Sequence, residues 1–190
     1  MYCDYLNLSA IMLALAGGSM NSGIIKLAAQ TKQDKTRYKQ LMSELTSIML
    51  LLSIVTIVLT LISLFVFSPN YLSKSLLMFT SITIVIRSFT TLMEGVANGK
   101  GNIAVLFWSK AILLITSLMS LYLVRYLDDY TIYFYLFPIT YIPVLFYLLL
   151  KIDFNSLIGI KYIKRKRLSE LASYSLYSFV TVLSTSLAML

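Results

Sequence analysis

Histidine is absent from this 190-residue sequence, and cysteine occurs only once, as Cys3. A single cysteine cannot form an internal disulfide, and without histidine no Ser/His or Cys/His catalytic pair exists. Zinc sites built from histidine or paired cysteines are excluded for the same reason. We therefore expect no enzyme activity, no catalytic residue, no metal site and no bound cofactor.

Charge is also scarce in this chain. Charged residues make up 13% of the sequence and apolar residues 58%, whereas a soluble domain has about 25% charged residues. That is too little polar surface to cover a water-soluble globule, so the composition predicts an all-α, polytopic helical membrane protein. The 16 basic residues outnumber the 8 acidic ones. In a membrane protein such an excess collects in cytoplasmic loops, and we expect no nucleic-acid partner.

Long uncharged runs define the predicted spans, because a helix of about 20 apolar residues crosses a bilayer. The sequence predicts five complete transmembrane helices, at about residues 5–26, 42–67, 75–97, 103–124 and 130–150. A sixth begins near residue 168 and stays uncharged from Leu171 to Leu190, where the sequence stops without a flanking charge. We therefore expect the sixth helix to be truncated and the chain to be a fragment.

Basic residues are concentrated in every second connecting loop. Those after the first, third and fifth spans are Lys32, Lys35, Arg37, Lys39, Lys100, Lys151, Lys161, Lys164, Arg165, Lys166 and Arg167. The loops after the second and fourth spans hold only Lys74 and Arg125. The positive-inside rule therefore places loops 31–41 and 151–167 in the cytoplasm and the N-terminus outside. An external N-terminus without a signal peptide predicts one further helix upstream.

Three cations in or beside the predicted spans are candidate substrate-binding residues. Arg87 lies near the middle of its span, where a charge is costly unless it faces the bundle interior or a watery pathway. Glu94, seven residues on, shares its helix face. Lys26 follows small residues at positions 17–23, which allow close helix packing or leave room for a cavity. Lys110 lies about two turns into the fourth span.

Each cation has a structural and a functional interpretation. Lys26 and Lys110 can extend to the membrane interface, and Arg87 can pair with a carboxylate or with backbone carbonyls. The functional alternative is a cationic cavity that accepts an anion, with phosphate as the natural choice. In the fifth span, Tyr141 and Tyr147 suit stacking on sugars as well as simple packing, and Pro138 and Pro143 predict a kink.

Two stretches carry a family resemblance. They are AGGSMNSGIIKLAAQ at residues 16–30 and LMEGVANGKGN at residues 92–102. The first is similar to the second-helix pattern of bacterial O-antigen and polysaccharide flippases of the Wzx type, in the multidrug/oligosaccharidyl-lipid/polysaccharide exporter superfamily. The second resembles that family's short loop between helices four and five. Glu94 departs from the pattern, since some members have a basic residue there.

The resemblance implies a V-shaped transporter bundle of two six-helix halves. Residues 1–150 would supply helices two to six of the first half, residues 151–167 the cytoplasmic linker, and residues 168–190 the truncated first helix of the second half. The implied function is to flip an undecaprenyl-diphosphate-linked oligosaccharide, such as the O-antigen unit of lipopolysaccharide, across the bacterial inner membrane by alternating access.

Partners and orientation follow from the same resemblance. The N-terminus would be periplasmic, and the partners would be the lipid-linked oligosaccharide, membrane lipids and other polysaccharide-assembly membrane proteins. Lys26, Arg87 and Lys110 would meet the diphosphate or acidic sugars. The coupling ion, H⁺ or Na⁺, stays open.

Three alternatives stay open at the level of sequence. A drug/cation antiporter of the same superfamily would favour acidic over basic residues within the membrane. A membrane enzyme of polysaccharide assembly would need a sizeable polar loop, whereas residues 151–167 contain one acid, Asp153. An inactive remnant is the third.

Overall fold

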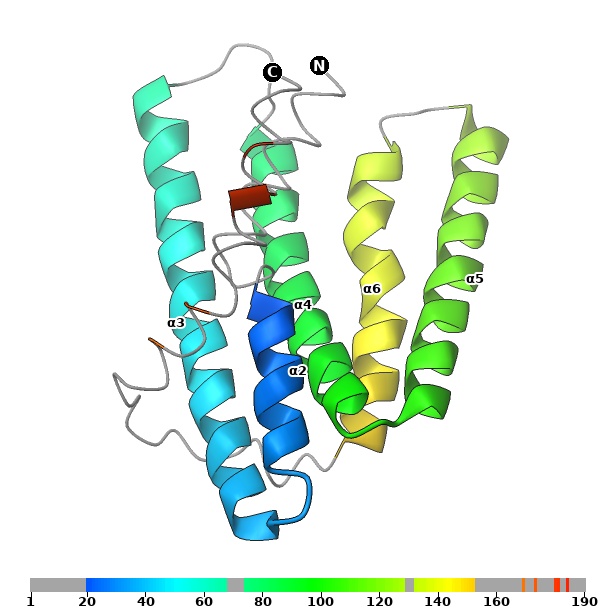
Figure 1. Cartoon of the computed structure of the whole chain (residues 1–190). Helices are drawn as coiled ribbons and strands as arrows, with labels where there is room; N and C mark the ends of the chain where they lie inside the picture. Colours follow the sequence, from blue (N-terminus) through cyan, green and yellow to red (C-terminus); the bar gives the residue numbers. More distant parts are fainter. Residues whose placement is uncertain are drawn as a thin grey trace.

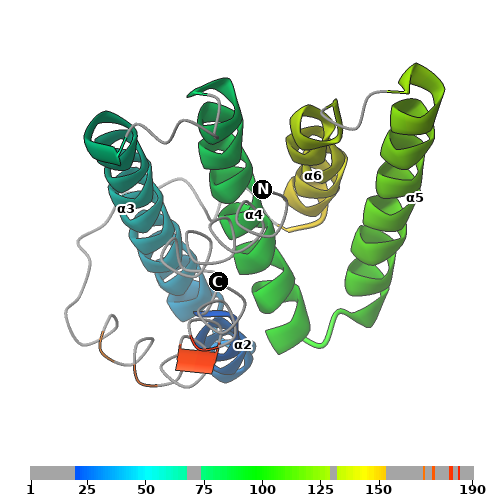
Figure 2. The same cartoon turned by 90° about the horizontal axis from the view of Figure 1, so that it is seen from above.

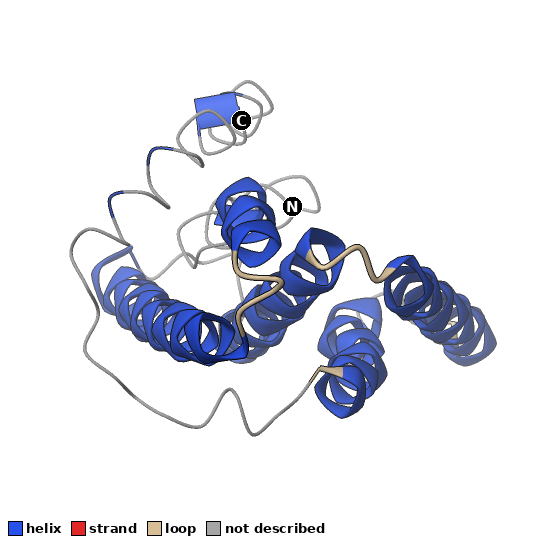
Figure 3. Cartoon of the chain, turned by 60° about the horizontal axis from the view of Figure 1, so that its bottom comes forward, coloured by secondary structure: helices blue, strands red, loops and turns tan. Residues whose placement is uncertain are grey.

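The computed structural model describes residues 20–67, 74–128 and 132–152, together with positions 169, 173, 180, 181 and 184. Its elements are α2 (Asn21–Gln30), α3 (Lys35–Phe67), α4 (Lys74–Gly99), α5 (Ile103–Leu127) and α6 (Ile132–Lys151). Within these residues every element is a helix (Figure 3), which confirms the all-α prediction for this part of the chain. Residues 153–167 of the predicted linker 151–167, most of the sixth helix and most of the first span lie outside the described ranges.

Successive helices run in alternating directions (Figure 1). The turns after α2 and α4 and the end of α6 lie together at one end, which we call the basic end. Its basic residues are Lys32, Lys35, Arg37, Lys39, Lys100 and Lys151. Arg125 and Asp128 lie at the opposite end. The described loops that were predicted to share one side of the membrane therefore share one end of the bundle.

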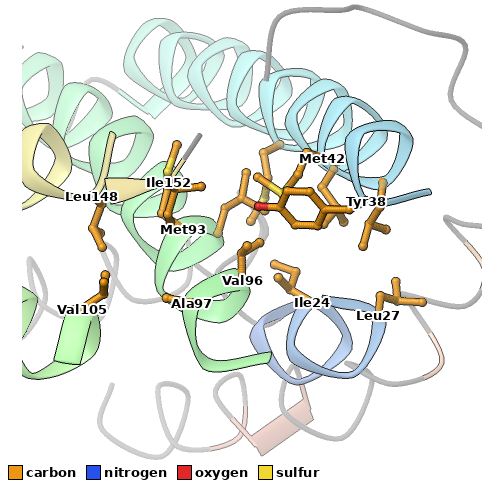
Figure 4. Packing of buried hydrophobic residues seen from close by; sticks show 14 of the residues in the cluster. Ile24, Leu27, Tyr38, Met42, Met93, Val96, Ala97, Val105, Leu148 and Ile152 are labelled. Carbon is orange, nitrogen blue, oxygen red and sulfur yellow. The ribbon is translucent and has the colours of Figure 1, made fainter. Parts of the chain in front are cut away.

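The helices are arranged in the order α3, α4, α6, α5, and α2 packs against α4 and α3 (Figure 2). The hydrophobic core occupies the half of the bundle near the basic end, where all five helices contribute (Figure 4). Fully buried members include Ile24 and Leu27 of α2, Met42 of α3, Val96 of α4 and Leu148 of α6. In a bilayer, close van der Waals packing of such side chains holds helices together, so this half stabilises the bundle.

The beginning of α3 corrects one boundary. The predicted span starts at residue 42 and the predicted loop covers 31–41, but the helix begins at Lys35 and leaves only residues 31–34 as a turn. Asp34 Oδ1 accepts hydrogen bonds from the backbone N–H groups of Thr36 (3.0 Å) and Arg37 (3.1 Å), which caps the helix. Tyr38 is then buried in the first turns. Hydropathy marks only the apolar part of such a helix.

Two glycines bring α2 and α4 into backbone contact. A methyl group at Gly99 would lie 2.5 Å from the carbonyl oxygen of Ile25 and 2.6 Å from Cβ of Ala28. A methyl at Gly95 would lie 2.9 Å from Cγ2 of Ile24. The spacing Gly-x-x-x-Gly is one that lets helices approach closely in membranes. The sequence predicted close packing through small residues at positions 17–23, of which 17–19 lie outside the described ranges. It did not predict a contact at Gly95, placed in the span 75–97, or at Gly99, placed beyond it.

The connection from α4 to α5 is a tight turn. The N–H of Asn102 bonds to the carbonyl of Ala97 (2.9 Å), and that of Gly101 bonds to the carbonyl of Asn98 (2.8 Å). These two bonds, with Gly101 at φ +74°, form a Schellman motif. The left-handed conformation favours glycine, because a Cβ would be strained there. The turn fixes how α5 leaves α4, and therefore which residues of the two helices face each other.

Two of the described helical segments have the length and apolar composition to cross a membrane. They are Lys35–Ile62 of α3 and Ile103–Leu127 of α5, whereas the apolar segment Tyr135–Lys151 of α6 is shorter. Much of α5 carries exposed apolar side chains, among them Leu114, Leu118, Met119, Leu121 and Tyr122. An apolar surface of this extent marks contact with a membrane or with another protein.

Candidate functional site

Arg87 lies in the middle of α4 and faces two aromatic rings of α6. Its guanidinium carbon lies 5.2 Å from the centre of the Tyr141 ring and 5.9 Å from that of Phe137. Both distances are within the range of cation–π attraction. Among the residues that the structure describes, no carboxylate pairs with Arg87. An arginine on an aromatic face keeps its in-plane N–H donors, so Arg87 can still bind an oxyanion.

The position of Tyr141 depends on an irregular stretch of α6. Pro138 and Pro143 lie inside this helix, and each removes a backbone N–H from the helical ladder. The Thr116 hydroxyl of α5 lies 3.1 Å from the carbonyl oxygen of Thr140, which joins α5 to this stretch. The Tyr141 ring also packs edge-on against Phe137, with centroids 5.5 Å apart. The two rings beneath Arg87 therefore support each other.

Lys110 is held by a carboxylate from the neighbouring helix. Its Nζ donates to Oε2 of Glu94 at 2.6 Å, and Oγ of Ser109 lies 3.2 Å from Oε1 of the same carboxylate. The Glu94 side chain is 15% exposed, whereas that of Lys110 is 62% exposed. Glu94 thus pairs with Lys110 on α5. Pairing of Arg87 with a carboxylate, the structural alternative, is not seen among the described residues.

Lys26 occupies a different position from the other two candidates. It is exposed on α2, one turn before the end of that helix. The side chains that contact Arg87 and Lys110 come from α4, α5 and α6, and Lys26 is not among them. The structure therefore shows two separate contacts along α4, Arg87 with the rings of α6 and Glu94 with Lys110 of α5. It supports no shared site with Lys26.

A groove between α3 and α4 is unsuited to an anion. It has a volume of about 390 Å³ and is lined by Ile57, Leu61, Ser81, Ile82, Val85 and Ile86. None of these described lining residues is charged, so an anion beside them would be desolvated without a partner. The acidic residues of the described part also form no group of three that could hold a metal ion. Buried polar groups also lie on α3, among them Glu44, Ser53 and Thr60, and the contacts of Arg87 and Lys110 lie on the side of α4 that faces α5 and α6.

The pairing of Glu94 with Lys110 had a weak signal in the sequence. Residues at similar distances from the turn of a helical hairpin lie at the same level, and these two flank the turn at residues 100–102 almost symmetrically. Level alone does not show that the two side chains meet, because that also depends on the rotation of α5 about its axis. The Schellman turn sets that rotation. The contact of Arg87 with Phe137 and Tyr141 had no comparable signal.

Comparison of the chain with protein-family models, curated proteins and solved structures found no match. The family resemblance carried by residues 16–30 and 92–102 therefore enters below only as a proposal.

Proposed function

We propose that this chain is part of a membrane transporter for an anionic, lipid-linked substrate. In the form that the sequence resemblance suggests, the substrate is an oligosaccharide on undecaprenyl diphosphate, and the chain helps to flip it across the bacterial inner membrane by alternating access. The five described helices would then belong to the first half of a two-half bundle. The basic end would face the cytoplasm, as the charge bias predicts.

One observation carries the proposal. Arg87, halfway along an apolar helix bundle, is held by the faces of Phe137 and Tyr141 and by no carboxylate of the described residues. A cation at that depth costs several kcal/mol in a membrane, so a protein gains little by placing one there unneutralised unless an anion completes the site. A drug/cation antiporter needs an acid within the bundle. Glu94 is paired with Lys110, and the buried Glu44 of α3 is a further acid that this alternative could use.

Binding of a prenyl diphosphate by the purified chain tests this proposal. In nanodiscs of phosphatidylcholine, which carries no net charge, we expect farnesyl diphosphate to bind and farnesol not to bind. Arg87→Gln should weaken binding by about tenfold or more, the cost of losing a charge-assisted hydrogen bond. Arg87→Lys should be intermediate, because an ammonium cannot bind phosphate in a bidentate manner.

Arg125→Gln is the matched control, since Arg125 is exposed at the far end of α5. Equal affinities of the wild type and Arg87→Gln would exclude Arg87 as the anion site. Transport itself is tested with vesicles that contain a fluorescent polyprenyl-diphosphate disaccharide. Quenching of the outer-leaflet dye then reports whether the chain moves the lipid between leaflets.

A further inference from the structure

We propose that Glu94 is an internal competitor for the substrate anion. In the empty site its carboxylate occupies Lys110, and an incoming anion gains the second cation only by displacing Glu94. This inference rests on the proposed function, in which Arg87 is the primary anion-binding group. It adds a residue that sets the affinity of the site, and it gives Lys110 a defined role.

The geometry shows a contact that an anion can reach. The Lys110–Glu94 distance of 2.6 Å is that of a full charge-assisted hydrogen bond. Lys110 is mostly exposed and Glu94 is mostly covered, so the ammonium is open on the side away from its partner. A ligand can therefore approach Lys110 without first entering the packed interior of the α4–α5 hairpin.

The order of charges along α4 brings the competitor close to the primary site. Glu94 lies seven residues after Arg87, so the two share one face and are about 10.5 Å apart along the helix axis. Lys110 meets Glu94 from α5. Glu94 thus contacts Lys110 directly and lies about two helical turns from Arg87 on the same face of α4. An anion with several charges can draw on both cations once Glu94 has moved aside.

The energetics favour an exchangeable pair over a structural one. The tight turn at residues 100–102 and the contacts of α6 with both α4 and α5 already fix the hairpin. An ion pair with an exposed partner contributes about 0.2–1 kcal/mol, so a diphosphate can compete with a single carboxylate. A pair meant only to hold the helices together would be expected to have both partners buried.

The test measures the affinity of the full chain for farnesyl diphosphate in phosphatidylcholine nanodiscs. Glu94→Gln, which is nearly isosteric, should bind roughly twofold to fivefold more tightly, as expected when an exposed ion pair is released. Glu94→Asp is the second variant, because it keeps the charge but withdraws the carboxylate from Lys110. A smaller gain is expected from it. Arg125→Gln again serves as the control.

Lys110 decides between this mechanism and a general charge effect. In the double variant Glu94→Gln/Lys110→Gln, the gain should disappear. If the gain persists there, Glu94 acts by repelling the anion directly, and the proposal is overturned. Unchanged affinity in both Glu94 variants also overturns it. If Arg87→Gln still lowers affinity in that case, the proposed function survives, whereas loss of the Arg87 effect removes both.

Discussion

The guanidinium of Arg87 and the ring of Tyr141 lie 5.2 Å apart, across the contact between α4 and α6. This contact joins the two helices at mid-length with a cation and an aromatic face, in a bundle whose apolar core lies mainly near the basic end. It serves packing and chemistry together, because the ring that steadies the arginine leaves its hydrogen-bond donors accessible.

Removing the Tyr141 ring should loosen this contact. We expect Tyr141→Leu to lower the free energy of unfolding by about 1–2 kcal/mol, through loss of the cation–π attraction and of the edge-on contact with Phe137. Tyr141→Phe should be nearly neutral. Thermal unfolding in detergent, followed by circular dichroism, measures the difference. Phe146→Leu is the matched control, because Phe146 is 63% exposed on the same helix; an equal loss there would refute the specific role of Tyr141.

The glycine contact between α2 and α4 should tolerate no added methyl group. Gly99→Ala places Cβ 2.5 Å from the carbonyl oxygen of Ile25, which is backbone and cannot rotate away. Overpacking of this kind costs about 1–3 kcal/mol, and the same unfolding experiment should show it. Asn98→Ala, at an exposed position between the two glycines, controls for the change in helix propensity. A Gly99→Ala protein as stable as the wild type would mean that α2 does not pack here.

The cap of α3 gives a third prediction. Asp34→Ala removes the acceptor for two backbone N–H groups, so it should destabilise the protein by about 1 kcal/mol. Asp34→Asn keeps a capping oxygen and loses only the exposed pair with Arg37, so its effect should be a few tenths of a kcal/mol. Gln33→Ala, one residue earlier and exposed, is the control. Equal losses in Asp34→Ala and Asp34→Asn would show that charge, and not capping, stabilises the turn.

The orientation in the membrane can be tested with single cysteines. In a Cys3→Ser background, Gln33→Cys reports on the basic end and Arg125→Cys on the opposite end. A membrane-impermeant thiol reagent added to intact cells should label only the cysteine at 125, because basic ends stay in the cytoplasm. Labelling of the cysteine at 33 alone would invert the proposed orientation. Labelling of both would argue against a membrane-spanning arrangement of the bundle.

Hydropathy predicted helix positions well where apolar runs coincide with helix ends. The predicted span at 103–124 became Ile103–Leu127, and that at 75–97 became Lys74–Gly99. It failed at the beginning of α3, where a polar, capped turn of helix precedes the apolar run. Hydropathy measures how well a segment fits a bilayer. Helix boundaries depend on capping groups, which hydropathy does not take into account.

The sequence indicated candidate residues for the site but not their contacts. Arg87 and Lys110 stand out because charge is costly within apolar runs. Which partner Glu94 takes depends on how α5 is rotated about its axis, and that rotation follows from the hydrogen bonds of the turn at residues 100–102. The aromatic partners of Arg87 come from α6, about 50 residues later in the chain, and no local pattern specifies which of its faces meets α4.

The contact of α2 with α4 at Gly95 and Gly99 has a mechanical consequence. Two helices in backbone contact, followed by a turn without slack, leave α2, α4 and the start of α5 little freedom to slide or tilt independently. These three segments would therefore move together as one rigid body. Bending is then easiest in α6, where Pro138 and Pro143 each remove a backbone hydrogen bond on either side of Tyr141. In such a motion the Tyr141 ring would move with α6, and Arg87 would keep its position on α4.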